Sequence, residues 1–344
     1  MTETNLTVEN TKKENETAGC AKNAAPKSFR IVGTGSCVPS RVVTNDDLTV
    51  FLDTSDEWIR SRSGIEQRHI CTKETTSDLA IGAARNALEN AGTSADEIDM
   101  ILCATISGEY ICPSMAALVQ RDLGAQCPCV DLSAACTGWI YLMDTAAAFF
   151  ARGGIRKMLI IGAESMSRIV NWHDRSTAVL FGDGAGAAVL EPGENYLASS
   201  FVTAGGDEVI AIPTKNGISP WFEKEEKLPL VFMDGQETYK FAVSNLPKRV
   251  DEVLAKAGLQ EEDLDWVVPH QANKRIIDSA SKRLKGVPAD HFCVNLQKYG
   301  NTSAASIPLV LDEWNRAGKF RRGDLIVMVA FGGGLSSAAC LVRW

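Results

Sequence analysis

The chain has 344 residues, of which 35 are Lys or Arg and 43 are Asp or Glu, so its formal net charge at pH 7 is −8. This acidic balance lacks the overall positive charge expected of a protein that binds nucleic acid or an anionic membrane surface. No stretch reaches the roughly 18 apolar residues of a membrane helix. We therefore expect a globular chain of about two domains that binds neither nucleic acid nor a membrane.

The first 28 residues are polar and lack the apolar segment of a signal peptide, which predicts a disordered tail and a cytoplasmic location. The ten cysteines are scattered along the chain, and in the cytoplasm we expect them to stay reduced. Four histidines and the absence of a Cys-x-x-Cys pair leave no zinc-ligand spacing, so no metal site is predicted.

The first glycine-rich segment begins at Gly33. A dinucleotide-binding motif would follow Gly33 and Gly35 with a third glycine where this chain has Val38. A turn or a close backbone approach is the better interpretation of these glycines. We therefore expect no nucleotide cofactor.

The chain resembles itself at three places. Residues 88–92 and 98–102 match residues 254–258 and 264–268, and each pair predicts a helix ended by glycine, a polar loop and a buried strand. Residues 129–132 match 293–296, and residues 181–184 match 331–334, in the same order. The repeats predict one α/β unit that occurs twice, with two sheets enclosed by helices. The halves would span residues 29–196 and 197–344.

Apolar runs within each half predict strands covered on both faces, at residues 157–162 and 324–330. Residues 205–229 are rich in Gly, Asn and Pro and include a charged run at 223–227, so we expect a surface excursion there.

Cys136 lies between an expected strand at 130–132 and an expected helix at 137–152, which glycines at 153 and 154 would end. The positive end of a helix and its free backbone N–H groups favour a thiolate and can hold an oxyanion. His270 follows the expected strand 266–268, and Asn301 lies beyond the expected strand at 293–296. Since ligands bind at strand ends in α/β sheets, we expect the three side chains to converge.

Five motifs carry a resemblance to a known family. They are residues 53–59 (DTSDEWI), 181–187 (FGDGAGA), 270–273 (HQAN), 300–306 (GNTSAAS) and 331–334 (FGGG). At these positions the chain resembles the β-ketoacyl-acyl carrier protein synthase III family of the thiolase superfamily, over essentially residues 29–344. The resemblance implies a thiolase-like five-layer αβαβα fold built from two duplicated halves, and a homodimer.

The resemblance also implies a reaction. Cys136 would accept an acyl group from acyl-coenzyme A, and His270 and Asn301 would hold the thioester carbonyl of malonyl-acyl carrier protein while it loses carbon dioxide. The backbone N–H groups of Cys136 and Gly333 would form the oxyanion hole. A carbonyl oxygen that gains negative charge requires hydrogen-bond donors, which an Asp in place of Asn301 would not supply.

Binding residues follow from the same family. Trp58 and Arg175 would sandwich the adenine of coenzyme A, Arg62 would contact a phosphate, and Asn273 would contact the pantetheine arm. The segment 274–285 has a net charge of +4. It would dock the acidic carrier protein, and its predicted contacts are Lys274, Arg275, Lys282 and Arg283.

Cys112 stands where many relatives have a bulky aromatic that shapes the acyl pocket across the dimer. Its smaller side chain predicts a primer longer or more branched than acetyl. Two other functions remain open: an acyltransferase or condensing enzyme of a specialised, polyketide-like pathway, and a non-catalytic partner subunit. The intact set of Cys136, His270 and Asn301 favours condensation.

Overall fold

The structure is a computed structural model that describes residues 28–214, 221 and 227–344. The expected tail, apart from Ser28, and the expected charged run 223–227, apart from Lys227, therefore lie outside the described residues.

Two sheets form the body of the molecule, and they have the same strand order. The first sheet runs β1 (Ser28–Cys37), β7 (Asp183–Gly193), β6 (Met158–Ser165), β4 (Met100–Ala104) and β5 (Cys129–Leu132). The second runs β8 (Tyr196–Thr203), β13 (Ser336–Arg343), β12 (Leu325–Gly332) and β11 (Trp266–Pro269). The outer pairs β1–β7 and β8–β13 are antiparallel, as are β6–β7 and β12–β13, whereas β4–β6 and β11–β12 are parallel. This matching order confirms the duplicated fold; the division at residues 196 and 197 stays a prediction.

The sheets differ at one edge, where a predicted strand is wrong. Parallel β5 completes the first sheet, but at the equivalent edge of the second only a single bridge joins Phe292 to Val267. The Gln271 side chain takes the place of further pairing, because its Nε2 donates to the carbonyl of Cys293 (3.1 Å) and its Oε1 accepts from the backbone N of Asn295 (2.9 Å). Residues 293–296 therefore do not form a strand, and a short helix begins at Leu296.

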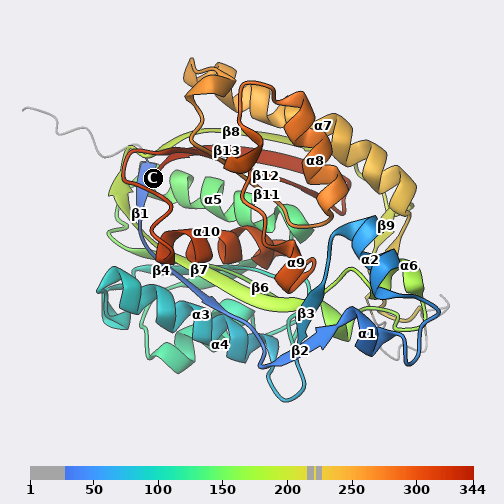
Figure 1. The fold of residues 1–344 in the computed structure, drawn as a ribbon. Helices are drawn as coiled ribbons and strands as arrows, with labels where there is room; N and C mark the ends of the chain where they lie inside the picture. Colours follow the sequence, from blue (N-terminus) through green and yellow to red (C-terminus); the bar gives the residue numbers. More distant parts are fainter. Residues whose placement is uncertain (1–27, 215–220, 222–226) are drawn as a thin grey trace, which may run out of the picture.

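Helices complete five layers, which Figure 1 shows from bottom to top. Below the first sheet lie α3 (Thr76–Ala91) and α4 (Met115–Leu123), between the sheets lie α5 (Gly138–Arg152) and α10 (Ser306–Arg316), and above the second lie α7 (Gly235–Ala257) and α8 (Lys274–Arg283). The remaining elements are shorter: α1 (Asn45–Leu48), α2 (Asp56–Ser63), α6 (Arg175–Ala178), α9 (Leu296–Tyr299), β2 (Arg41–Thr44), β3 (Gln67–Ile70), β9 (Ile210–Ala211) and β10 (Phe232–Met233).

Local signals in the repeats set the helix ends. Thr75 caps α3 in a capping box, and Gly92 ends the helix with φ of +61°. Asp234 caps α7 by accepting from two backbone N–H groups, and Gly258 ends that helix with φ of +68°. In both halves a single 3₁₀ turn then leads into the buried strand. The first of these strands, β4, begins at Met100, two residues later than predicted, because that turn extends to Glu97 and Asp99 precedes the strand.

The third repeat is only partly equivalent. Its two segments lead into β7 and β13, which hold matching places in their sheets. Phe331 and Gly332 still belong to β12, however. Phe181 instead lies before β7 and makes one β-bridge to Asn301. The difference arises because residues 166–182 separate β6 from β7, while only residues 333–335 separate β12 from β13.

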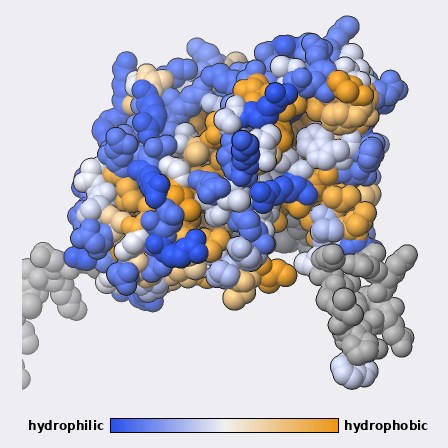
Figure 2. All heavy atoms as spheres, turned by 90° about the horizontal axis from the view of Figure 1, so that it is seen from below, coloured by the Kyte–Doolittle hydropathy of each residue, from blue (hydrophilic) through white to orange (hydrophobic). Residues whose placement is uncertain are grey.

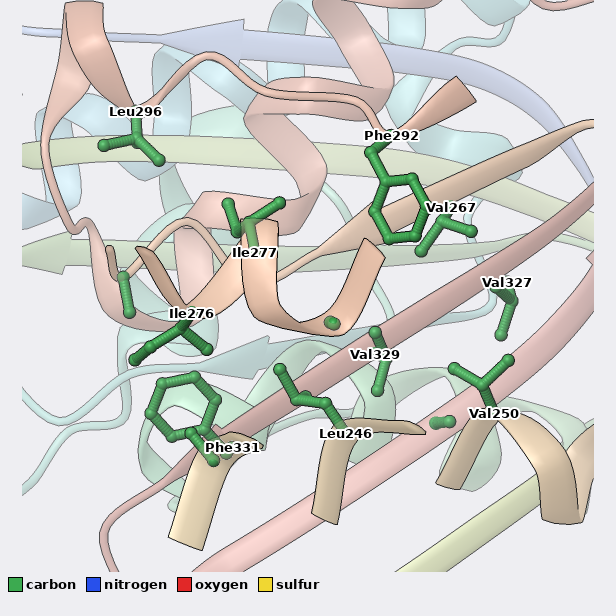
Figure 3. Close-up of a cluster of buried hydrophobic side chains, with 14 of the residues drawn as sticks. Leu246, Val250, Val267, Ile276, Ile277, Phe292, Leu296, Val327, Val329 and Phe331 are labelled. Carbon is green, nitrogen blue, oxygen red and sulfur yellow. The ribbon is translucent and has the colours of Figure 1, made fainter. Parts of the chain in front are cut away.

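Apolar packing holds the layers together. Figure 3 shows the packing above the second sheet, where Leu246 and Val250 of α7 and Ile276 of α8 lie with Val327 and Val329 of β12. These side chains are at most 5% exposed, and burying each contributes about 1.5–3 kcal/mol. The predicted strands at 157–162 and 324–330 are confirmed as β6 and β12, and every residue of both is buried.

The outer surface is mixed in character. Figure 2 views the molecule from the side of α3 and α4, and hydrophobic residues there lie in separate groups among hydrophilic ones. Within the described part of the chain, no helix combines the length and the apolar character needed to cross a bilayer.

Candidate active site

A cavity of about 1210 Å³ opens between the two halves. Cys136, His270, Asn301 and Gly333 all line it, although up to 197 positions separate them in the chain. Trp58, Arg62, Asn273 and Arg275 line it as well. The structure thus brings the three predicted catalytic side chains to one cavity, together with three of the four predicted coenzyme A contacts.

Cys136 sits in a 3₁₀ turn, Ala135–Thr137, that leads directly into α5. Ala135 has φ of +45°, a left-handed conformation that is strained for a residue with a side chain. A Cβ at Gly332 would lie 2.9 Å from the Cβ of Cys136, so only glycine permits this approach of β12. The helix that glycines 153 and 154 were expected to end does stop at Arg152.

Burial opposes the thiolate that the helix N-terminus favours. Burial raises the pKa of the Cys136 thiol to about 12, and the negative charge of Glu164 adds to the rise. Hydrogen bonds from the Ser303 side chain and a backbone group oppose these effects without overcoming them. The main cause is the removal of the sulfur from water, which disfavours the charged thiolate.

Asn301 is held by backbone hydrogen bonds on both sides. Its N–H donates to the carbonyl of Leu180 (2.8 Å), and its carbonyl accepts from Gly182 N (3.1 Å). Its side-chain Oδ1 accepts from the backbone N of Ser303 (2.9 Å). The amide NH₂ is therefore the group that Asn301 offers to the cavity as a donor.

His270 follows β11 directly and continues its pairing, since its backbone N donates to the carbonyl of Val329 (2.8 Å). Its Nδ1 lies 2.6 Å from Ser306 Oγ, an oxygen that also accepts from Gln271 N (3.4 Å). Burial lowers the pKa of His270 to about 3, so the ring is neutral at pH 7. A neutral ring that accepts at Nδ1 carries its proton on Nε2, which makes Nε2 a donor.

The two side chains predicted to sandwich the adenine contact each other. The guanidinium of Arg175 stacks over the ring of Trp58, 4.8 Å from its centroid, and donates to the carbonyl of Asp53 (2.8 Å). No ring fits between two groups at that separation, so Arg175 would have to move. Arg175 is also the one predicted coenzyme A contact that does not line the cavity.

Asn273 has a structural part in addition to its place on the cavity wall. Its Oδ1 caps α8 by accepting from Arg275 N (2.9 Å), and its Nδ2 donates to the carbonyl of Arg62 (3.1 Å). Both polar atoms of the side chain are thus engaged within the protein.

The predicted basic residues lie on α8, and only one of them reaches the cavity. Arg275 lines the cavity and stacks over Tyr239 at 5.6 Å. Lys274 pairs with Asp278 (2.7 Å), and Arg283 donates to the carbonyl of Val243 (2.8 Å), which ties α8 to α7. Lys282 also belongs to α8 and lies near its C-terminal end.

The sequence-based predictions missed three features of the site. Lys240 of α7 lines the cavity, but it stands alone in the sequence, outside any basic run. Residues 210–214 line it too, so this part of the expected surface excursion is a wall of the site. Glu164 ends a run of apolar residues in β6, and a carboxylate in a strand buried on both faces was a signal available in the sequence.

Cys112 is exposed and is not among the residues that line the cavity, whereas its neighbour Ile111 is. Across the described residues, no group of three or more His, Cys, Asp or Glu side chains is arranged to hold a metal ion.

Comparisons with known proteins agree on one family. The family described as 3-oxoacyl-[acyl-carrier-protein] synthase III matches residues 130–205, and its C-terminal counterpart matches residues 254–344. The chain is 45% identical over 322 residues to the β-ketoacyl-[acyl-carrier-protein] synthase III of Clostridium acetobutylicum, which covers 92% of this chain and 99% of the relative. It is 46% identical over 319 residues to that of Xanthomonas campestris pv. campestris, which covers 92% and 98%.

Solved structures are similar over comparable lengths. The 3-oxoacyl-[acyl-carrier-protein] synthase III of Aquifex aeolicus VF5 superposes with a TM-score of 0.86 at 43% identity, covering 92% of this chain and all of that one. The priming β-ketosynthase of the R1128 polyketide pathway gives a TM-score of 0.86 at 35% identity, covering 94% and 98%.

Proposed function

The chain belongs to the β-ketoacyl-acyl carrier protein synthase III family, the condensing acyltransferases that initiate fatty acid synthesis, and on that premise we propose how its own residues perform the reaction. The observation that carries the proposal is that Cys136, His270, Asn301 and Gly333 line one cavity. The substrates would be an acyl-coenzyme A and malonyl-acyl carrier protein, and no bound cofactor takes part.

In the first half-reaction the sulfur of Cys136 attacks the carbonyl carbon of the acyl thioester. The new S–C bond forms as the bond to the coenzyme A sulfur breaks, and the thiol proton of Cys136 passes to the departing coenzyme A sulfur. The backbone N–H groups of Cys136 and Gly333 hold the oxyanion, a role supported by the close approach of the adjacent Gly332 to Cys136.

In the second half-reaction the malonyl group loses carbon dioxide, and the electron pair of the broken C–C bond moves onto its thioester as an enolate. Nε2 of His270 and the amide of Asn301 donate to that oxygen. Both donors are neutral, so neither forms an ion pair with the malonyl carboxylate. Such an ion pair would stabilise the carboxylate against loss as carbon dioxide. The enolate carbon then attacks acyl-Cys136, and the Cys136 sulfur leaves as a thiolate, which takes a proton from solvent.

Substrate entry would use the wall formed by α2 and α8. Trp58, Arg62 and Asn273 line the cavity on the coenzyme A side, with Arg175 moving off Trp58 to admit the adenine. The cations of α8, joined by Lys240 of α7, would attract the acidic carrier protein to the same opening.

We also propose a homodimer formed through the edge of the first sheet. Strand β5 ends that sheet, and Val130 on it is 43% exposed. Nearby in sequence, Tyr110 is 61% and Ile111 is 95% exposed, which is unusual for large apolar side chains. In such a dimer Cys112 would reach the partner's acyl pocket, and its small size favours a primer longer or more branched than acetyl.

Intact-mass spectrometry tests the function directly. Wild-type protein is mixed with a series of acyl-coenzyme A thioesters, and malonyl-acyl carrier protein is then added. We expect Cys136 to gain the acyl mass and to lose it on condensation, with release of carbon dioxide. Absence of acylation by every primer would contradict the proposal and favour a non-catalytic partner subunit, and a clear preference for acetyl would overturn the inference about Cys112.

A second candidate is a priming condensing enzyme of a specialised pathway. The similarity to the priming β-ketosynthase of the R1128 pathway supports this second candidate. Condensation with the carrier proteins of both kinds of pathway, at matched concentrations, separates the two candidates, because the native carrier should react faster.

A further inference from the structure

Arg68 of β3 is a buried cation that the proposed mechanism does not use. The residue is 0% exposed. Its Nη2 donates to the carbonyl of Val179 (2.7 Å), and its Nη1 donates to Asn45 Oδ1 (2.8 Å) and to the carbonyl of Val43 (3.4 Å). Burial lowers the pKa of Arg68 to about 10, so the side chain remains a cation at pH 7. All three acceptors are neutral, although a buried charge is costly without an opposite one.

Asn301 is held by a segment that belongs to no strand. Its backbone N donates to the carbonyl of Leu180 (2.8 Å), and its carbonyl accepts from Gly182 N (3.1 Å). The segment 179–182 lies between α6 and β7 and is part of neither. The place of Asn301 therefore depends on the contacts that fix this segment.

The stem of Arg68 packs against both members of this pair. A Cβ added at Gly182 would lie 3.0 Å from the Cβ of Arg68, and one added at Gly300 would lie 3.5 Å from it. The guanidinium holds the carbonyl of Val179 at the start of the same segment. Arg68 thus contacts the segment that pairs with Asn301 and also the residue that precedes Asn301 in the chain.

The neighbours of Arg68 in β3 fix the chain that leads to Asn301. The backbone N of Glu66 donates to the carbonyl of Gln297 (3.1 Å), and the ring of His69 lies 5.6 Å from that of Tyr299, centroid to centroid. These contacts do not involve the Arg68 side chain. Replacing that side chain should therefore shift Asn301 locally and leave the surrounding chain in place.

The wall that would bind coenzyme A is fixed separately. Nδ2 of Asn45 donates to Asp56 Oδ1 (2.8 Å) in the first turn of α2 and to the carbonyl of Ile65 (2.8 Å) beyond its end. Both hydrogen bonds remain when Arg68 is replaced. Cys136 belongs to a different turn, so acylation should not depend on Arg68.

We propose that Arg68 is a positioning residue for the condensation step. It fixes the segment 179–182, and that segment holds Asn301 where its amide can donate to the enolate oxygen. A displacement of about 1 Å in such a group can slow a reaction about a hundredfold. The loss of Arg68 should therefore appear in the rate of condensation.

The inference rests on the proposed role of Asn301, and the two half-reactions are measured separately. Release of coenzyme A reports acylation, and release of carbon dioxide from malonyl-acyl carrier protein by preformed acyl-enzyme reports condensation. The variants are Arg68→Met, Arg68→Lys, Asn301→Ala and the double variant Arg68→Met with Asn301→Ala. The matched control is Arg249→Met, which removes another buried arginine, one that joins α7 to β8 and does not line the cavity.

In Arg68→Met the rate of condensation at saturating carrier protein should fall about 30-fold, while acylation stays within about threefold of wild type. Arg68→Lys should be similarly slow, because one ammonium group cannot occupy the places of both Nη1 and Nη2. Arg249→Met should change neither rate by more than about twofold. In the Asn301→Ala background, Arg68→Met should cause little further loss, because the group that it positions is already gone.

Three outcomes would overturn the inference while Asn301→Ala still condenses slowly. They are normal condensation by Arg68→Met, an equal loss in both half-reactions, and a further loss of about 30-fold in the double variant. Full activity of Arg68→Lys would overturn it as well, since charge alone would then suffice, and this variant decides the matter if Arg68→Met does not fold. Normal condensation by Asn301→Ala would contradict the proposed role of Asn301 and the inference with it.

Discussion

The two turns that meet at the centre of the molecule have the same geometry and different chemistry. In the first half the turn Ala135–Thr137 leads into α5, and in the second the turn Ser303–Ala305 leads into α10. The turns contact each other, and each begins with a residue at positive φ. Cys136 in the first matches Ala304 in the second, which is 1% exposed and does not line the cavity.

This difference teaches how a duplicated fold makes one active site. The backbone of Ala304 lies against Gly162, where an added Cβ would be 2.5 Å from the carbonyl oxygen of Ala304. The second turn therefore packs into the protein, while the first faces the cavity. The proposed chemistry of the second half comes from residues outside its turn, His270, Asn301 and Gly333. Four predictions test this division, and they run from the largest expected effect to the smallest.

Cys136→Ala should abolish acylation, and Cys136→Ala combined with Ala304→Cys should not restore it, because position 304 is enclosed. The measurement is the intact mass after addition of acyl-coenzyme A. Cys127→Ser, a change of a half-buried cysteine outside the cavity, is the control and should acylate normally. Acylation of the double variant at residue 304 would break the comparison between the turns.

Gly332→Ala should lower the acylation rate by about a thousandfold, because its methyl group would lie 2.9 Å from the Cβ of Cys136 and 3.0 Å from its backbone N. Gly333→Ala is the matched comparison. There the nearest atom is 3.5 Å away and the backbone N–H is kept, so the loss should be much smaller. Stopped-flow release of coenzyme A measures both, and equal rates for the two variants would contradict the close packing of the first turn against β12.

Asn301→Ala should leave acylation of Cys136 nearly intact and slow condensation by about 10²-fold, since one donor to the enolate is lost. Acyl-enzyme formation and carbon dioxide release are measured separately on the same preparation. Thr302→Ala, beside Asn301 but outside the cavity lining, is the control. Normal condensation by Asn301→Ala would contradict the role proposed for Asn301.

Glu164→Gln should stabilise the protein at pH 8 by at most about 3 kcal/mol, with little effect at pH 4.5. The carboxyl has a pKa of about 7 when folded and about 4.3 when unfolded. Its contribution is thus present below pH 4.3 and is lost as the pH rises through 7, because the folded state then has to hold a buried charge. Urea unfolding at both pH values measures the difference. An equal change in the free energy of unfolding at both pH values would show that the buried charge of Glu164 carries no such cost.

Much of the fold was predictable because its signals are local. Glycines at 92 and 258 end helices by adopting positive φ, and continuous apolar runs marked β6 and β12. The predicted strand at 293–296 failed for the opposite reason. The side chain of Gln271, more than twenty positions away, forms the hydrogen bonds that a neighbouring strand would have formed.

The site was predictable in its members but not in its electrostatics. The place of Cys136 between an expected strand and helix, and the motifs around His270 and Asn301, identified the three residues, and the cavity brings them together. The state of Cys136 was predicted from the helix N-terminus alone, which favours a thiolate. Burial acts against this effect by raising the thiol pKa, and burial is a property of the folded chain.

The sequence by itself determined the duplication, the family and the residue types at the reacting positions, because each of these is written in short segments. Only the tertiary structure decided that Arg175 stacks on Trp58, that Gln271 completes a sheet edge, and that Ser303 donates to the buried carboxylate of Glu164. These contacts span up to 139 positions, and their strength depends on the exclusion of water. Neither the distance between two such groups nor their dehydration has a signature in the order of residues.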